Sequence, residues 1–269
     1  MIQFILYFVL LIFPSNQIDE SKALIIFFSR AGENYNVGVV DKGNTEMIVD
    51  YITRVTKIKS FKINPETEYP INYTQTIEIA RSEKNSNARP KIKDPLTSID
   101  NYDTILLGYP IWHTNLPNIV MTQLELLNFE GKTIYPFNTH EGSGTGNSIN
   151  DIKNLVPKAV VKDGFALRGQ YARKEEYRTE IEKWLKEDLE LQISQNIPDS
   201  PVSSTQPDVS TTQPAVSTTE PGNTTLPGNT TQRNNTEDDE IIRIPQRNNY
   251  SNVLNYSMYL LIFILILII

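Results

Sequence analysis

The amino-acid sequence predicts an α/β fold, in which a doubly wound sheet of five parallel strands is covered by helices on both faces. Two observations support this prediction. Short apolar runs bounded by polar residues are typical of strands that are buried on both faces. Five such runs alternate with stretches of helical pattern, and this alternation predicts parallel strands joined by right-handed crossovers.

The strand patterns differ in strength. The strongest, KALIIFFS, is almost continuously apolar, and DTILLGYPIW and KTIYPFNTHEGSG come next. Two shorter runs, SFKIN and AVVKDGFALRG, have weaker patterns. We therefore predict strands within residues 22–29, 60–64, 103–112, 132–144 and 159–169.

Helices are predicted between and after these strands, at residues 45–55, 74–85, 118–127, 148–155 and 174–193. The last of them places Tyr177, Ile181, Trp184 and Leu185 on one side. This spacing indicates core packing against the sheet, with the charged residues on a solvated face.

Composition separates a globular part, residues 19–193, from the two ends of the 269-residue chain. Residues 1–18 have a short apolar core followed by Pro-Ser-Asn-Gln, which is typical of a cleaved signal peptide; a retained N-terminal anchor is the alternative. Residues 194–250 are rich in Ser, Thr, Pro and Asn. They cannot bury enough apolar surface to fold, and we predict a disordered stalk.

The C-terminal segment, residues 251–269, carries a short apolar run with no Lys or Arg after it. A spanning helix needs about 20 apolar residues, so the run favours a signal for a GPI anchor, with a short membrane-spanning tail as the alternative. Glycosylation sequons lie at Asn72, Asn223, Asn229, Asn234, Asn249 and Asn255. We therefore expect a secreted glycoprotein that is anchored in the membrane at the cell surface.

Composition also excludes several functions. The chain has no cysteine, which excludes thiol catalysis and iron–sulfur clusters. A formal net charge of −7 and the lack of a basic cluster argue against a nucleic-acid partner. The two histidines, His113 and His140, have no acidic pattern between them, so no metal site is expected.

Three loops follow the strongest predicted strands, at residues 29–44, 109–117 and 139–147. In an open parallel sheet, ligands bind beyond the carboxyl ends of the strands, near the point where the strand order reverses. We therefore expect the three loops to lie together at one edge of the sheet.

The first loop has the composition of an anion-binding turn. Ser29-Arg30-Ala31-Gly32 leaves the strand, and Gly43-Asn44-Thr45 opens the following helix. Small residues allow the backbone to curl around an anion, and the amides at a helix N-terminus favour negative charge. The Walker and dinucleotide-binding motifs are absent. The alternative is an ordinary turn in which Asn44 or Thr45 caps the helix.

The second and third loops have the character of a ring-binding site. Tyr109, Trp112 and His113 lie among prolines, an arrangement suited to stacking on a planar ring; alternatively, Trp112 packs into the core. The third loop, THEGSGTGNS, has three glycines within five residues. Glycines let backbone amides approach a ligand edge, although a flexible connection would have the same composition.

The segments FFSRAGEN, GNTE, LLGYPIWH and NTHEGSGTGNSINDI resemble the flavodoxin-like family, whose members bind FMN, over residues 22 to about 191. The resemblance implies the strand order 2-1-3-4-5 and FMN as the cofactor. It implies that the phosphate is held by Ser29, Arg30, Ala31, Gly32, Asn44 and Thr45. It also implies that Pro110, Ile111 and Trp112 border one ring face and the flavin N5 edge. The pyrimidine side would be met, largely through backbone groups, by Thr139, His140, Glu141, Gly142, Ser143 and Gly144.

One segment departs from the family pattern. The sequence ENYNVGVVDK, residues 33–42, separates the two parts of the first loop. Tyr35 and Val37 favour a lid over the phosphate or ribityl chain. The alternative is a variable loop on the surface, which inserted segments form more often.

The resemblance implies a redox function, in which the flavin carries electrons while the protein sets its potential and orientation. No side chain is expected to act as an acid, base or nucleophile. An electron carrier and an FMN-dependent oxidoreductase, such as a quinone or NAD(P)H-dependent reductase, both fit, with the redox donor and acceptor left open. The alternative from another class is a cofactor-free surface-display or adhesion module on the same fold.

Overall fold

The computed structural model describes residues 18–193. The predicted signal peptide except for its last residue, the predicted stalk and the predicted C-terminal anchor segment lie outside these residues. Within residues 18–193, no helix is both long enough and apolar enough to cross a membrane.

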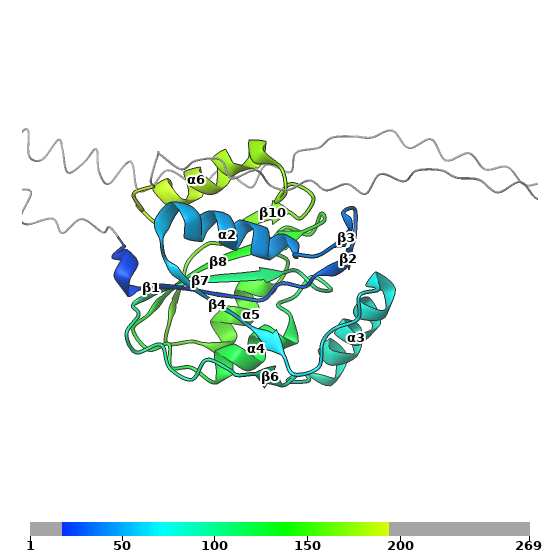
Figure 1. The fold of residues 1–269 in the computed structure, drawn as a ribbon. Helices are drawn as coiled ribbons and strands as arrows, with labels where there is room; N and C mark the ends of the chain where they lie inside the picture. The colour runs from blue at the N-terminus through cyan, green and yellow to red at the C-terminus, as the bar shows by residue number, and fades with distance from the viewer. Residues whose placement is uncertain (1–17, 194–269) are drawn as a thin grey trace, which may run out of the picture. The chain divides into compact units, whose positions relative to one another are not determined.

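The centre of the domain is a parallel sheet (Figure 1). Its strands, in spatial order, are β4 (Lys59–Lys62), β1 (Ala23–Phe27), β7 (Thr104–Pro110), β8 (Thr133–His140) and β10 (Phe165–Arg168). A further short strand, β9 (Val160–Val161), also pairs with β8. All of these pairings are parallel. With β9 and β10 sharing the fifth position, the sheet has the predicted order 2-1-3-4-5.

The fifth position is occupied by two strands instead of the one predicted at residues 159–169. β9 pairs with the beginning of β8, and β10 pairs with its end, so the sheet has six strands in five positions. The residues between them, Lys162 to Gly164, include an Asp-Gly pair, a strong turn signal. The turn preference of this pair therefore interrupts the hydrogen bonds with β8 between β9 and β10.

The residues of β1 explain why it lies inside the sheet. All five are buried, and they alternate between two hydrophobic clusters: Ile25 and Phe27 face one side, and Leu24 and Ile26 face the other. Successive side chains of a strand point to opposite faces, so a continuous apolar run requires cover on both.

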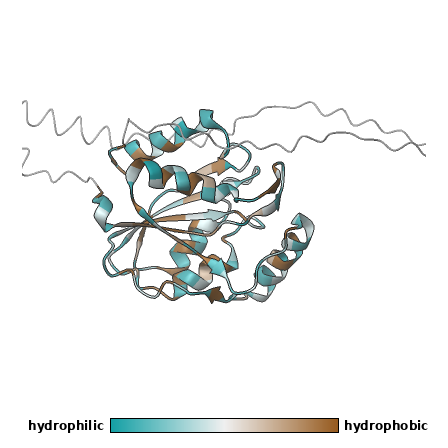
Figure 2. Cartoon of the chain, viewed as in Figure 1, coloured by the Kyte–Doolittle hydropathy of each residue, from teal (hydrophilic) through white to brown (hydrophobic). Residues whose placement is uncertain are grey.

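Four helices provide this cover (Figure 1): α2 (Asn44–Thr56) and α6 (Arg178–Glu187) on one face, and α4 (Asn118–Glu125) and α5 (Ser148–Leu155) on the other. Figure 2 shows hydrophilic and hydrophobic bands on the helices, the amphipathic pattern expected of helices that pack on a sheet. A single 3-10 turn, η1 (Glu20–Lys22), precedes the sheet.

The last helix is shorter than the predicted range 174–193. A 3-10 turn, η2 (Glu175–Tyr177), precedes α6, and the chain turns after it at Glu190, which has φ 53°. Ile181, Trp184 and Leu185 are buried in the cluster beneath the helix, as the spacing predicted.

One helix does not cover the sheet. α3 (Tyr73–Ser86) lies beside the carboxyl ends of the strands (Figure 1), where it contacts α4 and β2, and buries only Thr76 and Ala80. The helix predicted at residues 74–85 is thus present, but it covers neither face of the sheet. Its buried surface is too narrow to act as sheet cover.

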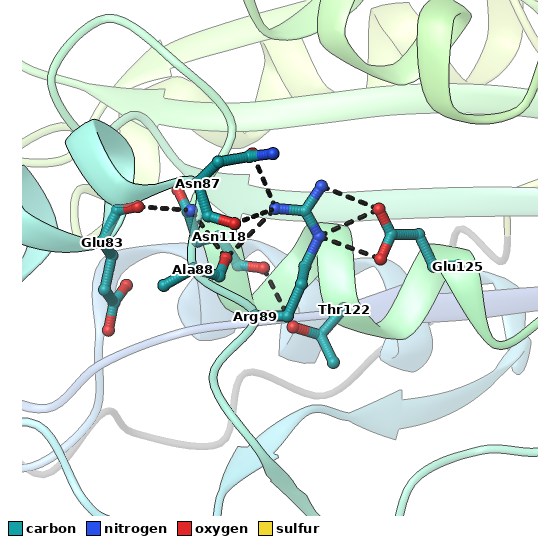
Figure 3. A network of polar contacts seen from close by, with 7 residues as sticks. All are labelled: Glu83, Asn87, Ala88, Arg89, Asn118, Thr122 and Glu125. Atoms are coloured by element: carbon teal, nitrogen blue, oxygen red, sulfur yellow. Dashed lines mark hydrogen bonds and ion pairs between the residues drawn. The ribbon is translucent and has the colours of Figure 1, made fainter.

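A polar network fastens the C-terminal end of α3 to α4 (Figure 3). The Arg89 guanidinium donates to both carboxylate oxygens of Glu125, at 2.7–2.9 Å. The Asn118 carboxamide, at the start of α4, donates to the carbonyl oxygens of Glu83 and Ala88. These bonds satisfy carbonyl groups at the end of α3 and fix its direction relative to the sheet.

The segment at residues 33–42 is part of an antiparallel hairpin, made of β2 (Gly32–Asn34) and β3 (Gly38–Val40). The hairpin is fastened to the start of α3, because the Glu33 carboxylate accepts hydrogen bonds from the Asn72 side chain and the Tyr73 amide. A second small antiparallel pair, β5 (Asn64–Pro65) and β6 (Ile92–Lys93), lies in the connections on either side of α3.

Candidate functional site

A pocket of about 230 Å³ lies at the carboxyl ends of the strands. The loops after β1, β7, β8 and β10 contribute to its wall, together with the hairpin and α3. Its lining residues are Arg30, Asn34, Tyr35, Asn44, Tyr73, Thr76, Ile77, Ala80, Pro110, Ile111, Trp112, His113, Thr139, His140, Glu141 and Gly169. The three sequence-predicted loops therefore do meet at one edge of the sheet.

The loop after β7 presents Trp112 to this pocket. The indole also packs edge-on against Phe28, with ring centroids 5.3 Å apart, and against Tyr69, at 4.9 Å. Trp112 thus combines the two roles that the sequence left open, because it packs against core aromatics and lines the pocket. Contacts of this kind hold the ring in one orientation and suit it to stacking.

The remaining aromatic residue predicted for this platform does not reach the pocket. Tyr109 is fully buried, and its hydroxyl is 3.0 Å from the Ser148 hydroxyl. It lies on β7 itself, where successive side chains point to opposite faces of the sheet, and its ring is in the cluster covered by α4 and α5. Its expected role in ring stacking was therefore wrong, whereas His113, which was predicted with it, lines the pocket.

His113 and Thr114 form a strained turn in the same loop. Both have positive φ, 46° and 64°, which is uncommon for residues other than glycine. The turn is held by its neighbours: the Lys84 ammonium donates to the His113 carbonyl at 2.8 Å, and a His113 ring nitrogen is 2.9 Å from the Ile77 carbonyl oxygen. α3 therefore supports the loop that carries Trp112.

The loop after β8 supplies polar groups to the pocket. His140 Nδ1 accepts a hydrogen bond from the Gly142 amide at 2.9 Å, and burial, with Arg168 nearby, lowers the pKa of His140. One oxygen of Glu141 accepts from the Gln170 amide at 3.0 Å. The other, Oε2, is buried without a hydrogen bond of normal geometry among the described residues, although the Asn36 side chain lies near the carboxylate. Burial raises the pKa of Glu141.

The N-terminus of α2 is the part of the site suited to an anionic ligand. Gly43 precedes the helix, and Asn44 and Thr45 are its first residues. The Ser29 hydroxyl accepts a hydrogen bond from the Glu46 amide at 3.1 Å, which ties the end of β1 to this first turn. A Cβ on Gly43 would overlap the Ser29 hydroxyl and the Arg30 carbonyl, so the close approach requires glycine.

The Arg30 guanidinium, for which the resemblance implied a phosphate contact, is bound to backbone carbonyl groups in the described structure. Its guanidinium donates to the carbonyl oxygens of Pro70 (2.8 Å), Ile71 (3.2 Å) and Glu33. Burial lowers its pKa, against the opposing effects of Glu33 and Tyr73. Arg30 therefore lines the pocket, but most of its hydrogen bonds fasten the hairpin to the segment before α3.

The predicted site residues fall into three groups. Eight line the pocket: Arg30, Asn44, Pro110, Ile111, Trp112, Thr139, His140 and Glu141. Four line a second cavity of about 460 Å³, whose wall includes the first loop and the end of β4: Ser29, Arg30, Ala31 and Gly32. Thr45 is buried, and Gly142, Ser143 and Gly144 belong to neither cavity.

Three structural elements bring further residues to the site: the hairpin, α3 and the loop after β10. Of these residues, the sequence had pointed only to Tyr35, as part of a lid. The hairpin contributes Tyr35, which stacks on Tyr73 of α3 with ring centroids 5.8 Å apart. The loop after β10 contributes Gly169, where a Cβ would overlap the Asn44 side chain. This last loop could have been found from sequence, because it too follows a strand of the parallel sheet.

Among residues 18–193, no group of three or more His, Asp and Glu residues could hold a metal ion. The pocket combines aromatic rings with a helix N-terminus, two guanidinium groups nearby and a buried carboxylate oxygen that lacks a partner among the described residues. This set of groups is suited to an organic anion.

Residues 35–188, more than half of the chain, match the family described as Flavodoxin. The chain belongs to the flavodoxin family, and FMN is the cofactor of that family. The match begins within the hairpin, so Ser29 to Gly32 lie outside it. No curated protein matches the chain.

Several solved structures are similar to the described fold. One is a protein from Bacteroides uniformis provisionally described as a flavoprotein, with 25% identity and a TM-score of 0.49 over 62% of this chain and 98% of that one. Another, from Bacteroides eggerthii and described in the same way, has 27% identity and a TM-score of 0.48 over 64% and 99%. A flavoprotein in complex with FMN from Lactobacillus acidophilus has 21% identity and a TM-score of 0.44 over 61% and 98%.

The residues present fit FMN. A flavin needs an apolar and aromatic wall for its ring, an acceptor for the N–H of its pyrimidine ring and an anion site for its phosphate. Trp112 and Ile111 supply the wall, the unpartnered Glu141 Oε2 is an acceptor, and the first amides of α2 have no partner inside the helix.

Proposed function

We propose that the domain holds FMN in the pocket at the carboxyl ends of the strands and acts as a redox protein. The observation that carries this proposal is the meeting of Trp112, Glu141 and the N-terminus of α2 in one pocket. When bound, FMN supplies one- or two-electron transfer. Membership of the flavodoxin family supports the assignment of FMN. The position of the pocket also supports it, because an open parallel sheet binds its ligands beyond the carboxyl ends of its strands.

The side chains of the pocket divide the work of binding. Trp112 and Ile111 exclude water from one side of the ring, and Glu141 fixes the direction of the pyrimidine edge. Asn44 and the first amides of α2 hold the phosphate, and Tyr35 of the hairpin borders the opening. The described residues thus orient the cofactor, and no acid, base or nucleophile is required of them.

Between the two redox classes, the size of the pocket favours an electron carrier. Pockets that bury a drug-sized ligand typically have volumes of about 300–1,000 Å³. A pocket of about 230 Å³ is smaller than this range, so we propose that part of FMN stays exposed and that no second ring stacks on the first. Electrons would then pass through the exposed edge to a docked protein partner, instead of to a small substrate bound beside the flavin.

The same proposal places the domain on the outer face of a membrane, held there by a glycosylated stalk. Its support is the composition of residues 1–18 and 194–269. Treatment of expressing cells with a phosphatidylinositol-specific phospholipase C tests the anchor. Release of the protein supports the lipid anchor, and retention after treatment supports the membrane-spanning tail.

The visible absorption spectrum of the full-length chain, purified in mild detergent with and without added FMN, tests cofactor binding. We expect flavin bands that remain with the protein after gel filtration. We also expect affinity for FMN to fall by about tenfold or more in Trp112→Ala, because an aromatic wall is removed, and to fall less in Trp112→Phe, which keeps a ring. A folded chain that ignores FMN would favour the cofactor-free surface-display module.

A further inference from the structure

A second arginine lies at the N-terminus of α2, and it comes from a part of the chain distant in sequence. Arg173 follows Gly169 in the loop between β10 and η2. Its Nε donates to the Asn44 side-chain oxygen at 3.1 Å, and its Nη2 donates to the Lys42 carbonyl. Two different N–H groups of one guanidinium thus fasten the residues immediately before and at the start of the helix.

Asn44 is held from two sides. Its oxygen accepts from Arg173, and its side-chain nitrogen lies so close to Gly169 that a Cβ there would overlap it. Asn44 in turn lines the pocket. Arg173 is therefore placed beside the part of the pocket where the first amides of α2 favour negative charge.

The charge of Arg173 has no acidic partner among the described residues, whereas Arg89 pairs with Glu125 and Arg178 pairs with Glu175. Burial alone lowers the pKa of Arg173, with no opposing carboxylate. A guanidinium has five N–H donors, and the two described bonds leave three of them open. A partly buried cation without a carboxylate is suited to an anionic ligand, because an unpaired charge is costly to bury.

We infer that Arg173 binds the phosphate of FMN and makes the site prefer FMN over riboflavin. The inference rests on the proposed function. It makes Arg173 the residue whose positive charge pairs with the phosphate, whereas the family resemblance had pointed to Arg30. The Arg30 guanidinium donates hydrogen bonds to the carbonyl oxygens of Glu33, Pro70 and Ile71. Arg173, by contrast, is already oriented by Asn44 and keeps donors for a phosphate.

The test compares two ligands that differ only in the phosphate. Dissociation constants of FMN and riboflavin are measured by flavin fluorescence quenching with the full-length chain, for the wild type, Arg173→Gln and Arg173→Ala. Arg173→Gln removes the charge but keeps an amide that can donate to Asn44. Lys153→Ala, which removes one positive charge from the exposed side of α5, is the matched control.

We expect affinity for FMN to fall about 10- to 100-fold in both Arg173 variants, with riboflavin affinity unchanged within twofold, because hydrogen bonds to charged groups are the strong ones. Lys153→Ala should bind both flavins like the wild type. If Arg173→Ala does not fold, Arg173→Gln decides alone. The inference is overturned if Arg173→Gln keeps wild-type FMN affinity, or if both flavins weaken equally. A wild type that binds neither flavin would instead refute the proposed function, and the inference with it.

Discussion

Thr45 and Thr139 meet in the interior with their hydroxyl oxygens 2.8 Å apart, although they are 94 positions apart in sequence. Both are buried, one in the first turn of α2 and the other near the end of β8. The bond joins the two segments that carry the anionic end and the pyrimidine end of the proposed site. A buried hydroxyl that loses its hydrogen-bond partner destabilises the folded state, so the removal of either hydroxyl is expected to lower the free energy of unfolding.

Replacement of Thr45 by Val is therefore expected to lower the free energy of unfolding by about 1–3 kcal/mol, since Thr139 is left without a partner. Thr139→Val should have a similar effect, and the double variant should be less destabilised than the sum of the two. Urea unfolding followed by tryptophan fluorescence measures this, because both tryptophans, Trp112 and Trp184, lie in the described domain. Strict additivity of the two changes would contradict a direct bond.

His140 gives the site a dependence on pH. Its folded-state pKa is lowered by burial and by Arg168, relative to an unfolded value of about 6.5. A lowered pKa means that the folded state resists protonation. The contribution to stability is present above about pH 6.5 and is lost as the pH falls toward the folded-state pKa. A protonated Nδ1 also cannot accept the Gly142 amide proton.

We expect the wild type to lose more stability between pH 7.5 and pH 5.5 than the variant His140→Asn, which offers an acceptor that does not titrate. Urea unfolding at the two pH values gives the comparison. Glu141, whose pKa is raised by burial, and the other histidine, His113, are present in both proteins, so their effects cancel in the difference. Equal losses in the two proteins would show that His140 is not responsible.

At the scale of elements, the loops after β7 and β8 are locked together at Gly146. Its φ is 51°, and a Cβ there would overlap the Thr114 carbonyl oxygen. The same carbonyl accepts from the Asn147 amide at 2.7 Å. The third glycine of the loop therefore serves close packing between two loops, whereas the composition alone had suggested contact with a ligand.

Gly144 is a matched control for this contact, because its φ is 57° and a Cβ there would meet nothing within 4 Å. Both Gly144→Ala and Gly146→Ala introduce a left-handed alanine, at about 1–2 kcal/mol. Only Gly146→Ala also separates the loops, so its loss in unfolding free energy should be clearly larger. Chemical unfolding of the two variants measures the difference, and equal losses would show that the loops are not locked at this glycine.

Elements with strong local patterns were predictable from sequence, and their placement was only partly so. The burial of β1 follows from its continuous apolar run, and the helix at Asn44–Thr56 follows from its start signal and spacing. α3 was found as a helix, but its position beside the sheet depends on tertiary contacts such as Arg89 with Glu125. No local pattern encodes those contacts.

The candidate site shows the same division. Residues that directly follow a strand, such as Trp112 and Glu141, were predictable because the topology of a parallel sheet brings strand ends together. Tyr35 was considered only as part of a lid, and Arg173 was missed, since their positions depend on how the hairpin and the last loop fold back. Gly142 and Gly144 line neither cavity, and composition does not distinguish a glycine that permits a turn from one that admits a ligand, so their contact with a ligand stays a prediction.

At the scale of the whole chain, the division into a domain and two flanking regions can be tested directly. We expect a broad-specificity protease to trim the full-length chain to a stable fragment that begins near residue 18 and ends near residue 193. Proteases cleave exposed, unfolded backbone first, and residues 194–250 have the composition of a segment that does not fold. Mass spectrometry of the product gives the ends. Cleavage inside the sheet at the same rate would argue against the proposed division.

The position of α3 has a consequence for engineering. Its inner side forms one wall of the pocket through Tyr73, Thr76, Ile77 and Ala80, yet α3 covers neither face of the sheet. The helix is attached through Glu33 at its beginning and Asn118 at its end. Substitutions on the pocket side of this one helix can therefore reshape what approaches the site without disturbing the main core. We expect substitutions at exposed or pocket-lining positions of α3 to alter what reaches the site while the sheet is left unchanged, provided that the contacts of the helix with Glu33, His113 and Asn118 are kept.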